Sequence, residues 1–140
     1  MKADIEHFVA EAARAINDRD WEAYGRLFSE NLEMQTPGLP GVTIGRQARV
    51  ALVQGIVAPF PDGQVDLERT ITEGDWGCLQ LRFSGTHTGP MATPDGGEIP
   101  PTNKPVEFPY CLVAKFENGV VTELQEYYDQ LAVMTQLGLM

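Results

Sequence analysis

At 140 residues the chain has the length of one ordinary domain, and its twenty acidic against ten basic residues give a net charge of −10. The hydrophobic content of 43% with 21% charged residues is typical of a folded globule, and the absence of a Lys/Arg cluster argues against a nucleic acid partner. Without a signal-peptide core or a run of about 18 apolar residues, we expect one cytoplasmic domain over residues 1–140 with no membrane partner.

The N-terminal segment predicts two helices that meet at a tight corner. Apolar residues recur at spacings of three and four from Ile5 to Ile16, behind Asp4 as a possible N-cap. Residues 17–20 break this pattern, and Asp20 can cap a second, short helix. That helix would carry Trp21, Tyr24, Leu27 and Phe28 at helical intervals.

The next segments predict a short strand and a third helix. Residues 32–36 form a plausible strand that ends at a Pro/Gly cluster, and Gln35 or Thr36 could face a cavity. From Arg46 to Val57 the apolar residues nearly encircle the segment, which predicts a helix that is buried on most sides.

Two strands and a long loop follow. Residues 65–72 alternate between apolar and polar side chains, so we expect a half-buried strand. Residues 76–87 form the next strand, which ends at His87. Residues 88–101 are rich in Gly and Pro and have no periodicity, as is typical of a lid or a binding loop.

The last third of the chain predicts a long hairpin that carries one unexpected charge. Two β-rich runs, 106–116 and 120–129, flank an Asn-Gly pair, and such a pair favours a type I′ turn. Alternation places Glu126 in line with apolar and aromatic residues. A brief helical pattern then ends at Gly138, which completes an α+β domain of three helices on one face of a curved sheet.

This order of elements comes with four short stretches, Gly85-Thr86-His87-Thr88-Gly89, Pro100-Pro101-Thr102, Phe116-Glu117-Asn118-Gly119 and Gln136-Leu137-Gly138. Together they resemble the SnoaL-like polyketide cyclases and ester cyclases of the nuclear transport factor 2-like superfamily. The resemblance implies a cone in which three N-terminal helices pack on a curved, mainly antiparallel sheet, with a short C-terminal helix. The open end of such a cone admits a flat apolar ligand.

For chemistry, the resemblance implies an intramolecular aldol condensation without metal or cofactor, in which an acidic residue on the last strand is the acid/base. That residue falls at Glu126, where the characterised cyclases have Asp. Their assisting histidine falls at Leu112, whereas His87 matches the family pattern. Many relatives also carry a histidine on the first strand, where this chain has Met34 and Gln35.

We expect Glu126 to face a pocket and act as acid/base, because apolar surroundings raise the pKa of a carboxyl group toward the operating pH. The pocket walls would come from Phe108, Tyr110, Leu112 and Tyr128. Alternatively, a bulge reverses the alternation and Glu126 is solvated. If no cation pairs with a buried Glu126, Glu126→Gln should stabilise the fold at neutral pH; otherwise His87 is the first partner to suspect.

The other candidates keep two or more interpretations each. His87 could orient a carboxylate, protonate a substrate oxygen or bond the loop backbone, and Asp129 could act in catalysis or cap the last helix. Cys78 and Cys111 could be buried, reduced thiols, or they could have a metal-binding or nucleophilic role. Aromatic residues that could line a pocket or simply form core are Trp21, Tyr24, Phe28 and Phe60.

The sequence therefore predicts a small, cofactor-independent and metal-free enzyme that uses carboxylate acid/base chemistry on an apolar, polyketide-like ketone or ester. The alternative is a non-catalytic protein that binds or carries a small hydrophobic molecule. We also expect a homodimer or higher oligomer through the outer sheet face, which carries Trp76 and Cys78 beside Arg82, a residue suited to a surface ion pair.

Overall fold

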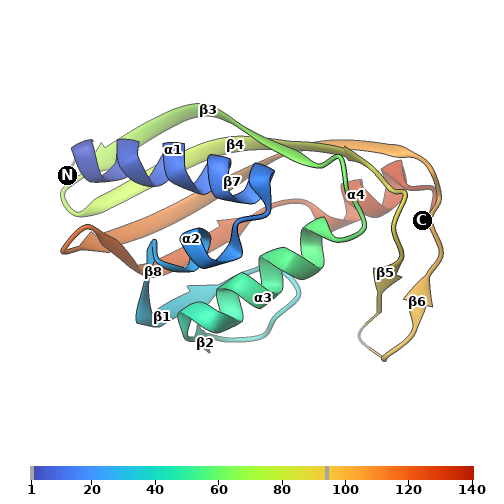
Figure 1. Cartoon of the computed structure of the whole chain (residues 1–140), viewed down its shortest axis with the longest axis horizontal. Helices are drawn as coiled ribbons and strands as arrows, with labels where there is room; N and C mark the ends of the chain where they lie inside the picture. The colour runs from blue at the N-terminus through green and yellow to red at the C-terminus, as the bar shows by residue number, and fades with distance from the viewer. Residues whose placement is uncertain (1, 94) are drawn as a thin grey trace.

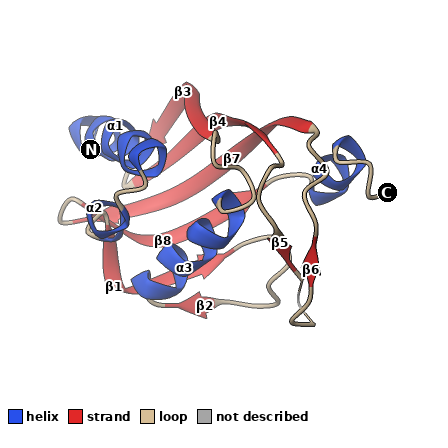
Figure 2. Cartoon of the chain, turned by 45° about the vertical axis from the view of Figure 1, so that its right-hand side comes forward, coloured by secondary structure: helices blue, strands red, loops and turns tan. Residues whose placement is uncertain are grey.

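The computed structural model describes residues 2–93 and 95–140. It contains a curved six-stranded sheet with three helices on one face, a fourth helix near the C-terminus and a small two-stranded sheet (Figures 1 and 2). The helices are α1 (Lys2–Asp18), α2 (Trp21–Gly25), α3 (Arg46–Val57) and α4 (Gln130–Gln136). The long strands are β1 (Phe28–Gln35), β3 (Gln64–Glu73), β4 (Trp76–Thr86), β7 (Pro105–Glu117) and β8 (Val120–Tyr127). The short strands are β2 (Thr43–Ile44), β5 (Met91–Ala92) and β6 (Glu98–Ile99). The expected α+β architecture is confirmed.

The main sheet has the strand order β2-β1-β8-β7-β4-β3, and its neighbours are antiparallel except for the parallel pair β1 and β8. The predicted hairpin is β7 and β8. Its turn residues Asn118 and Gly119 have φ values of 52° and 81°, as a type I′ turn requires. This turn places β8 beside β7 and brings the last strand into the middle of the sheet.

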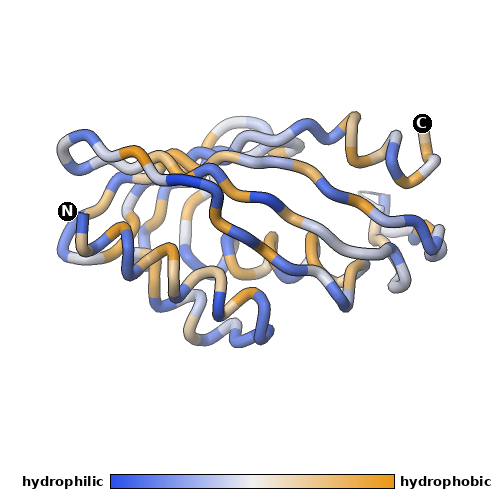
Figure 3. The backbone as a smooth tube through the Cα atoms, turned by 90° about the horizontal axis from the view of Figure 1, so that it is seen from above, coloured by the Kyte–Doolittle hydropathy of each residue, from blue (hydrophilic) through white to orange (hydrophobic). Residues whose placement is uncertain are grey.

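The core lies between the inner sheet face and helices α1 to α3. Hydrophobic and hydrophilic residues alternate along much of the sheet (Figure 3), and alternate residues of β4 and β7 are buried, so these strands offer one face to the core. Helix α1 approaches β4 closely at Gly77, where an added Cβ would collide with Ile5 Cδ1. Phe8 of α1 packs edge-to-face on Phe28 and Phe116, with ring centroids 5.7 and 5.6 Å apart. This end of the sheet is filled by aromatic side chains.

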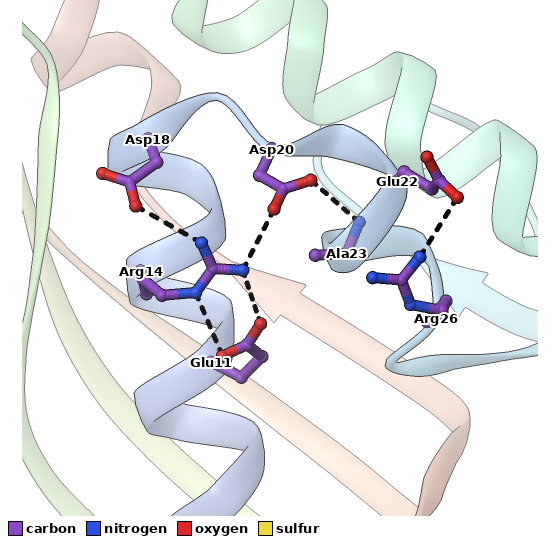
Figure 4. Close-up of polar contacts among 7 residues, drawn as sticks. All are labelled: Glu11, Arg14, Asp18, Asp20, Glu22, Ala23 and Arg26. Carbon is purple, nitrogen blue, oxygen red and sulfur yellow. Dashed lines mark hydrogen bonds and ion pairs between the residues drawn. The ribbon is translucent and has the colours of Figure 1, made fainter.

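The corner between α1 and α2 is fixed by Asp20, as predicted (Figure 4). Its carboxylate accepts a hydrogen bond from the backbone N–H of Ala23 at 3.2 Å and a second one from Arg14, also at 3.2 Å. Helix α2 is shorter than expected, because Phe28 begins β1. The N-cap prediction for Asp4 is wrong, since Asp4 lies within the first turn of α1.

The prediction of a half-buried strand is wrong for most of β3. Val65 is buried, but a β-bulge between Leu67 and Arg69 reverses the alternation, and β3 lies at the edge of the sheet. As a result Ile71 pairs with Cys78 and is 58% exposed. A pattern of alternation cannot reveal an inserted residue.

The expected loop after β4 contains a small hairpin, formed by β5 and β6, that lies near the end of α3 (Figure 2). The base of this segment is tied at His87. The N–H of His87 donates to the carbonyl of Lys104 at 3.0 Å, and the N–H of Asn103 donates to the carbonyl of His87 at 2.9 Å. Further along, the N–H groups of Thr88 and Gly89 both donate to the carbonyl of Pro59.

On the outer face of the sheet, the thiols of Cys78 and Cys111 are half-buried, with their sulfur atoms 3.2 Å apart. Arg82 pairs with Glu68 at 2.9 Å and Glu107 at 3.2 Å, as the surface prediction requires. Oligomerisation through this face stays a prediction. Within residues 2–93 and 95–140, no helix combines the length and the apolar character that crossing a membrane demands.

Candidate functional site

The side chain of Glu126 lies on the inner face of the sheet and is only 6% exposed. Strand β8 turns Leu124 and Glu126 inward, and Glu126 is paired in register with Leu112 of β7. The register shifts nearer the turn, between Lys115 and Phe116, so the alternation around Glu126 is intact. The interpretation of Glu126 as a solvated residue is therefore wrong.

Arg49 of α3 binds the Glu126 carboxylate through both of its terminal nitrogens. Nη1 donates to Oε1 at 3.2 Å and Nη2 donates to Oε2 at 3.1 Å, in the two-point geometry that suits a guanidinium and a carboxylate. Arg49 is 2% exposed, so both charges lie away from water. Glu126 thus has a cation partner, and that partner is Arg49 in place of the suspected His87.

Two hydroxyl groups complete this cluster. The Thr36 hydroxyl donates to Glu126 Oε1 at 2.8 Å, and Arg49 Nε donates to the Tyr24 hydroxyl oxygen at 3.1 Å. Burial raises the pKa of Tyr24, which keeps its hydroxyl neutral. Burial alone would lower the pKa of Arg49, but the Glu126 carboxylate and Tyr24 raise it above its usual range. We call Tyr24, Thr36, Arg49 and Glu126 the carboxylate cluster.

Some hydrogen-bonding positions of Glu126 and Arg49 are not used within the carboxylate cluster. A carboxylate has about four acceptor positions, and Glu126 uses three of them, two on Oε1 and one on Oε2. Arg49 has five N–H groups; one meets Tyr24, two meet Glu126, and one points at Met34 Sδ, 3.7 Å from Nη1. Among residues 2–93 and 95–140, one acceptor position on Oε2 and one N–H on Nη2 have no partner.

Arg49 and Glu126 both line a small cavity of about 40 Å³ beneath α3. Its other walls are apolar or aromatic, and include Val53, Ile56, Phe83, Phe108, Tyr110 and Tyr128. The Tyr110 hydroxyl makes no hydrogen bond to the described part of the chain. Burial, and then the nearby Glu126 charge, raise the pKa of Tyr110, so its hydroxyl remains a donor at neutral pH.

An outer groove of about 380 Å³ adjoins this cavity and shares Ile56, Phe108 and Tyr128 with it. The groove runs between the end of α3, strand β5 and helix α4. Residues contributed by these elements and the following turn include Gly55, Phe60, Met91, Val133 and Met134. The cavity and the groove therefore share part of their walls, and the side chains that line both are mostly apolar.

The other two predicted catalytic residues lie outside the carboxylate cluster. His87 is fully buried. Its Nδ1 lies 3.0 Å from the Thr102 hydroxyl oxygen and accepts a hydrogen bond from the backbone nitrogen of Thr102 at 3.2 Å. Its Nε2 has no hydrogen-bond partner within residues 2–93 and 95–140. Asp129 accepts a hydrogen bond from the N–H of Ala132 at 3.0 Å and caps α4, as one of its two interpretations requires.

The predicted ligand-binding residues divide by location. Phe108, Tyr110 and Tyr128 line the cavity and Phe60 lines the groove. The remaining five lie elsewhere: Phe28 and Leu112 are in the core, Tyr24 is bonded to Arg49, Trp21 lies at a groove between α2 and α3, and Gln35 is exposed at the end of β1.

Sequence reasoning did not identify Arg49 as a functional residue. The sequence did contain a signal for this role: Arg49 is a charged residue within a predicted helix that is apolar on nearly every side. A charge buried in this way needs an opposite partner, and Glu126 was the one carboxylate expected to face the core. Thr36, one of two residues proposed to face a cavity, is the one that reaches Glu126.

Comparisons with known proteins agree with this architecture. A structure described as a SnoaL-like polyketide cyclase from Jannaschia sp. CCS1 superimposes with a TM-score of 0.83 at 21% identity, covering 99% of this chain and 94% of the other. Wild-type IdmH from Streptomyces antibioticus, described as a polyketide cyclase, gives 0.79 at 23% identity, with 95% and 97% coverage. A protein of ketosteroid isomerase-like fold from Catenulispora acidiphila DSM 44928, in complex with trimethylamine, gives 0.75 at 20%, with 95% and 93% coverage.

At these identities the structural neighbours establish the fold, which is the expected nuclear transport factor 2-like cone. No curated protein matches the sequence. The model of one protein family, the SnoaL-like polyketide cyclases, matches residues 4–137, nearly the whole chain. This protein therefore belongs to the SnoaL-like polyketide cyclase family.

Proposed function

We propose that the protein is an enzyme that transfers a proton to and from the carbon next to the carbonyl of an apolar ketone or ester. One observation carries the proposal: a buried carboxylate, that of Glu126, faces a mostly apolar cavity together with free hydrogen-bond donors on Arg49 and Tyr110. A carrier of apolar molecules has no need of a charged pair at the end of its binding site.

The chemistry follows from the positions left free. The open acceptor position on Glu126 Oε2 takes the proton from the substrate carbon, and the electron pair of that C–H bond moves onto the carbonyl oxygen. The resulting enolate accepts hydrogen bonds from Arg49 Nη2 and from the Tyr110 hydroxyl. Glu126 then returns its proton to carbon, or to the alkoxide that forms if the enolate attacks a second carbonyl of the same molecule.

The positive charge of Arg49 is balanced throughout the proton transfer, so the net charge of the site does not change. When Glu126 takes up a proton, Arg49 loses its counter-ion, but the negative charge reappears on the enolate oxygen within the same cavity. The guanidinium therefore remains compensated throughout the step. Because this interaction with substrate grows as the negative charge develops, it stabilises the transition state more than the bound ketone.

Hydrogen exchange on a simple ketone tests the proposal without knowledge of the natural substrate. The probe is 2-tetralone in D₂O, and NMR measures deuterium incorporation next to the carbonyl. The wild type should accelerate exchange above the buffer rate, and Glu126→Gln should reduce that acceleration by about 100-fold or more. Glu123→Gln, which alters an exposed carboxylate of the same strand, is the matched control and should exchange like the wild type.

The alternative, a non-catalytic carrier, predicts a different result. A carrier would bind the probe, as seen by calorimetry, yet exchange its hydrogens no faster than buffer does. Equal rates for wild type and Glu126→Gln would also contradict the proposed role of the carboxylate.

A further inference from the structure

We propose that Cys78 and Cys111 form a redox site, in which a hydroperoxide oxidises the two thiols to a disulfide between strands β4 and β7, and small thiols reduce that disulfide again. They are the two cysteines of the sequence, and both lie half-buried on the outer face of the sheet. This redox site lies on the opposite face from the carboxylate cluster and does not depend on the proposed function.

The register of β4 and β7 brings the two thiols together. Cys78 is paired with Val113 and Cys111 is paired with Gln80, so the cysteines are diagonal neighbours on one face of the sheet. Their sulfur atoms lie 3.2 Å apart. A disulfide bond is about 2.0 Å long, so each sulfur has to move by only about 0.6 Å, which small rotations of the two side chains supply.

The usual role of a cysteine as a small apolar core residue does not account for this pair. Leu79 and Leu112, which follow Cys78 and Cys111 in the sequence, point inward and belong to the hydrophobic core. The two cysteines point to the other face and lie outside that core. Two thiols that meet on a face without a core role are suited to chemistry with each other.

Solvent reaches the thiol pair from both sides. Ile71 of β3, which is paired with Cys78, is 58% exposed. Tyr127 of β8, which is paired with Cys111, is 55% exposed. A molecule as small as a peroxide can therefore approach the sulfur atoms while the sheet stays folded.

The two thiols differ in reactivity. Burial, and then the contact with Cys78, raise the pKa of Cys111 to about 11, so Cys111 keeps its proton at neutral pH. Its S–H group can donate to the Cys78 sulfur across the 3.2 Å contact. Because the thiolate is the form that attacks an oxidant, the first step of oxidation falls to Cys78.

The reaction then needs one equivalent of hydroperoxide. The Cys78 thiolate attacks one peroxide oxygen, the O–O bond breaks, and the products are a sulfenic acid on Cys78 and an alcohol, or water when the oxidant is hydrogen peroxide. The Cys111 sulfur next attacks the Cys78 sulfur. The S–O bond breaks, and the departing hydroxide takes the Cys111 proton and leaves as water. Two electrons have passed from the thiols to the peroxide.

The exposure of the pair also makes the disulfide reversible. A disulfide that is open to solvent can be attacked by a small thiolate such as that of glutathione, through a mixed disulfide. A second glutathione then releases both cysteines as thiols and leaves oxidised glutathione. Deeply buried disulfides are protected from this attack, so the half-buried position favours a switchable bond over a permanent one.

Peroxide treatment of the folded wild type tests the redox site. Hydrogen peroxide in small excess should remove two hydrogens from the mass of each chain, and a peptide map without reductant should contain Cys78 linked to Cys111. Millimolar glutathione should restore both thiols. Since the cysteines lie 33 positions apart, closing this loop should also raise the urea midpoint of unfolding by roughly 1 M or more.

A matched control keeps two half-buried thiols but separates them. Ser84 also lies half-buried on the outer face of β4, and the variant Ser84→Cys with Cys111→Ser places its thiols about 20 Å apart along that strand. Peroxide should convert these thiols to sulfenic and sulfinic acids without a disulfide within the chain. A disulfide within the control chain would show that peroxide traps unfolded molecules, which overturns the proposal.

Single variants test the order of attack. Cys111→Ser keeps the attacking thiol and should lose it to peroxide at about the rate at which the wild type reacts, whereas Cys78→Ser should react about tenfold more slowly. The reverse order would overturn the role given to Cys78.

Three results on the wild type would overturn the redox site as a whole. One is a disulfide that forms only between chains, seen as a covalent dimer on a gel without reductant. Another is a pair of thiols that resists peroxide in the folded protein and reacts only in urea, as expected if a second copy covers the outer face. The third is a urea midpoint that falls on oxidation, because the bond would then form only by distorting the sheet.

Discussion

Glu126 and His87 are both ionisable and both buried, yet their surroundings differ in kind. The cluster around Glu126 draws side chains from α2, α3, β8 and the residue that follows β1, and its two charges are paired through two hydrogen bonds. The His87 side chain bonds to a single residue, Thr102, and its Nε2 has no partner in the described structure. The bonds of the carboxylate cluster therefore join elements from across the chain, whereas the side-chain bonds of His87 stay within its own loop.

The bonds of His87 also determine where its hydrogen lies. Because the N–H of Thr102 donates to Nδ1, that nitrogen acts as an acceptor, and the hydrogen of the neutral ring sits on Nε2. His87 therefore secures both ends of the loop that carries β5, a wall of the outer groove. Its observed contacts support the third of its interpretations, a bond to the loop backbone.

Arg49→Met should have the largest effect on stability. The variant keeps much of the side-chain volume but leaves the Glu126 carboxylate buried without a cation, which costs about 3 to 5 kcal/mol in free energy of unfolding. Urea titration followed by circular dichroism measures the loss. A loss below about 1 kcal/mol would mean that the pair is hydrated and that the comparison with His87 does not hold.

Glu126→Gln should destabilise the protein by about 3 kcal/mol, because Arg49 loses its counter-ion. This sign is opposite to the one expected for an unpaired carboxylate. The double variant Arg49→Met with Glu126→Gln should be more stable than the sum of the two single losses allows, since it removes both charges. Additive losses would show that the two side chains do not interact.

Thr102→Val should cost only about 1 kcal/mol, because it removes the hydroxyl beside His87 Nδ1 but keeps the backbone N–H bond. Urea unfolding measures this loss too, and combining Thr102→Val with Arg49→Met tests independence. The two losses should add, since the residues share no hydrogen-bond partner. Strong coupling would place His87 in the same network as Glu126.

Tyr110→Phe should have the smallest effect at neutral pH and a larger one in alkali. The pKa of Tyr110 is raised in the folded state, so below about pH 10, the pKa of an unfolded tyrosine, neither state is ionised and the raised pKa has no effect. Above that pH the unfolded state gives up its proton first, and stability falls as pH rises toward the folded pKa. Melting temperatures at pH 9 and pH 11 should differ less for the variant than for the wild type.

The sequence predicted best what depends on local pattern. Residue spacing within a single segment was enough to predict three features: the bounds of α3, the turn at Asn118 and Gly119, and the inward direction of Glu126. The partner of Glu126 could not be read in this way, because Arg49 lies on another element and an ion pair depends on how the helix docks. The exposure of Ile71 was missed for a similar reason, since a bulge and an edge position are properties of strand pairing.

The distance along the chain between Arg49 and Glu126, 77 positions, bears on the order of folding. A guanidinium surrounded by apolar residues keeps its water until its carboxylate arrives, and that carboxylate lies on the last strand of the sheet. Helix α3 can therefore form early but cannot dock until the β7–β8 hairpin has joined β1. We expect Arg49→Met to accelerate unfolding and leave the folding rate nearly unchanged, which assigns closure of the cavity to the final step of folding.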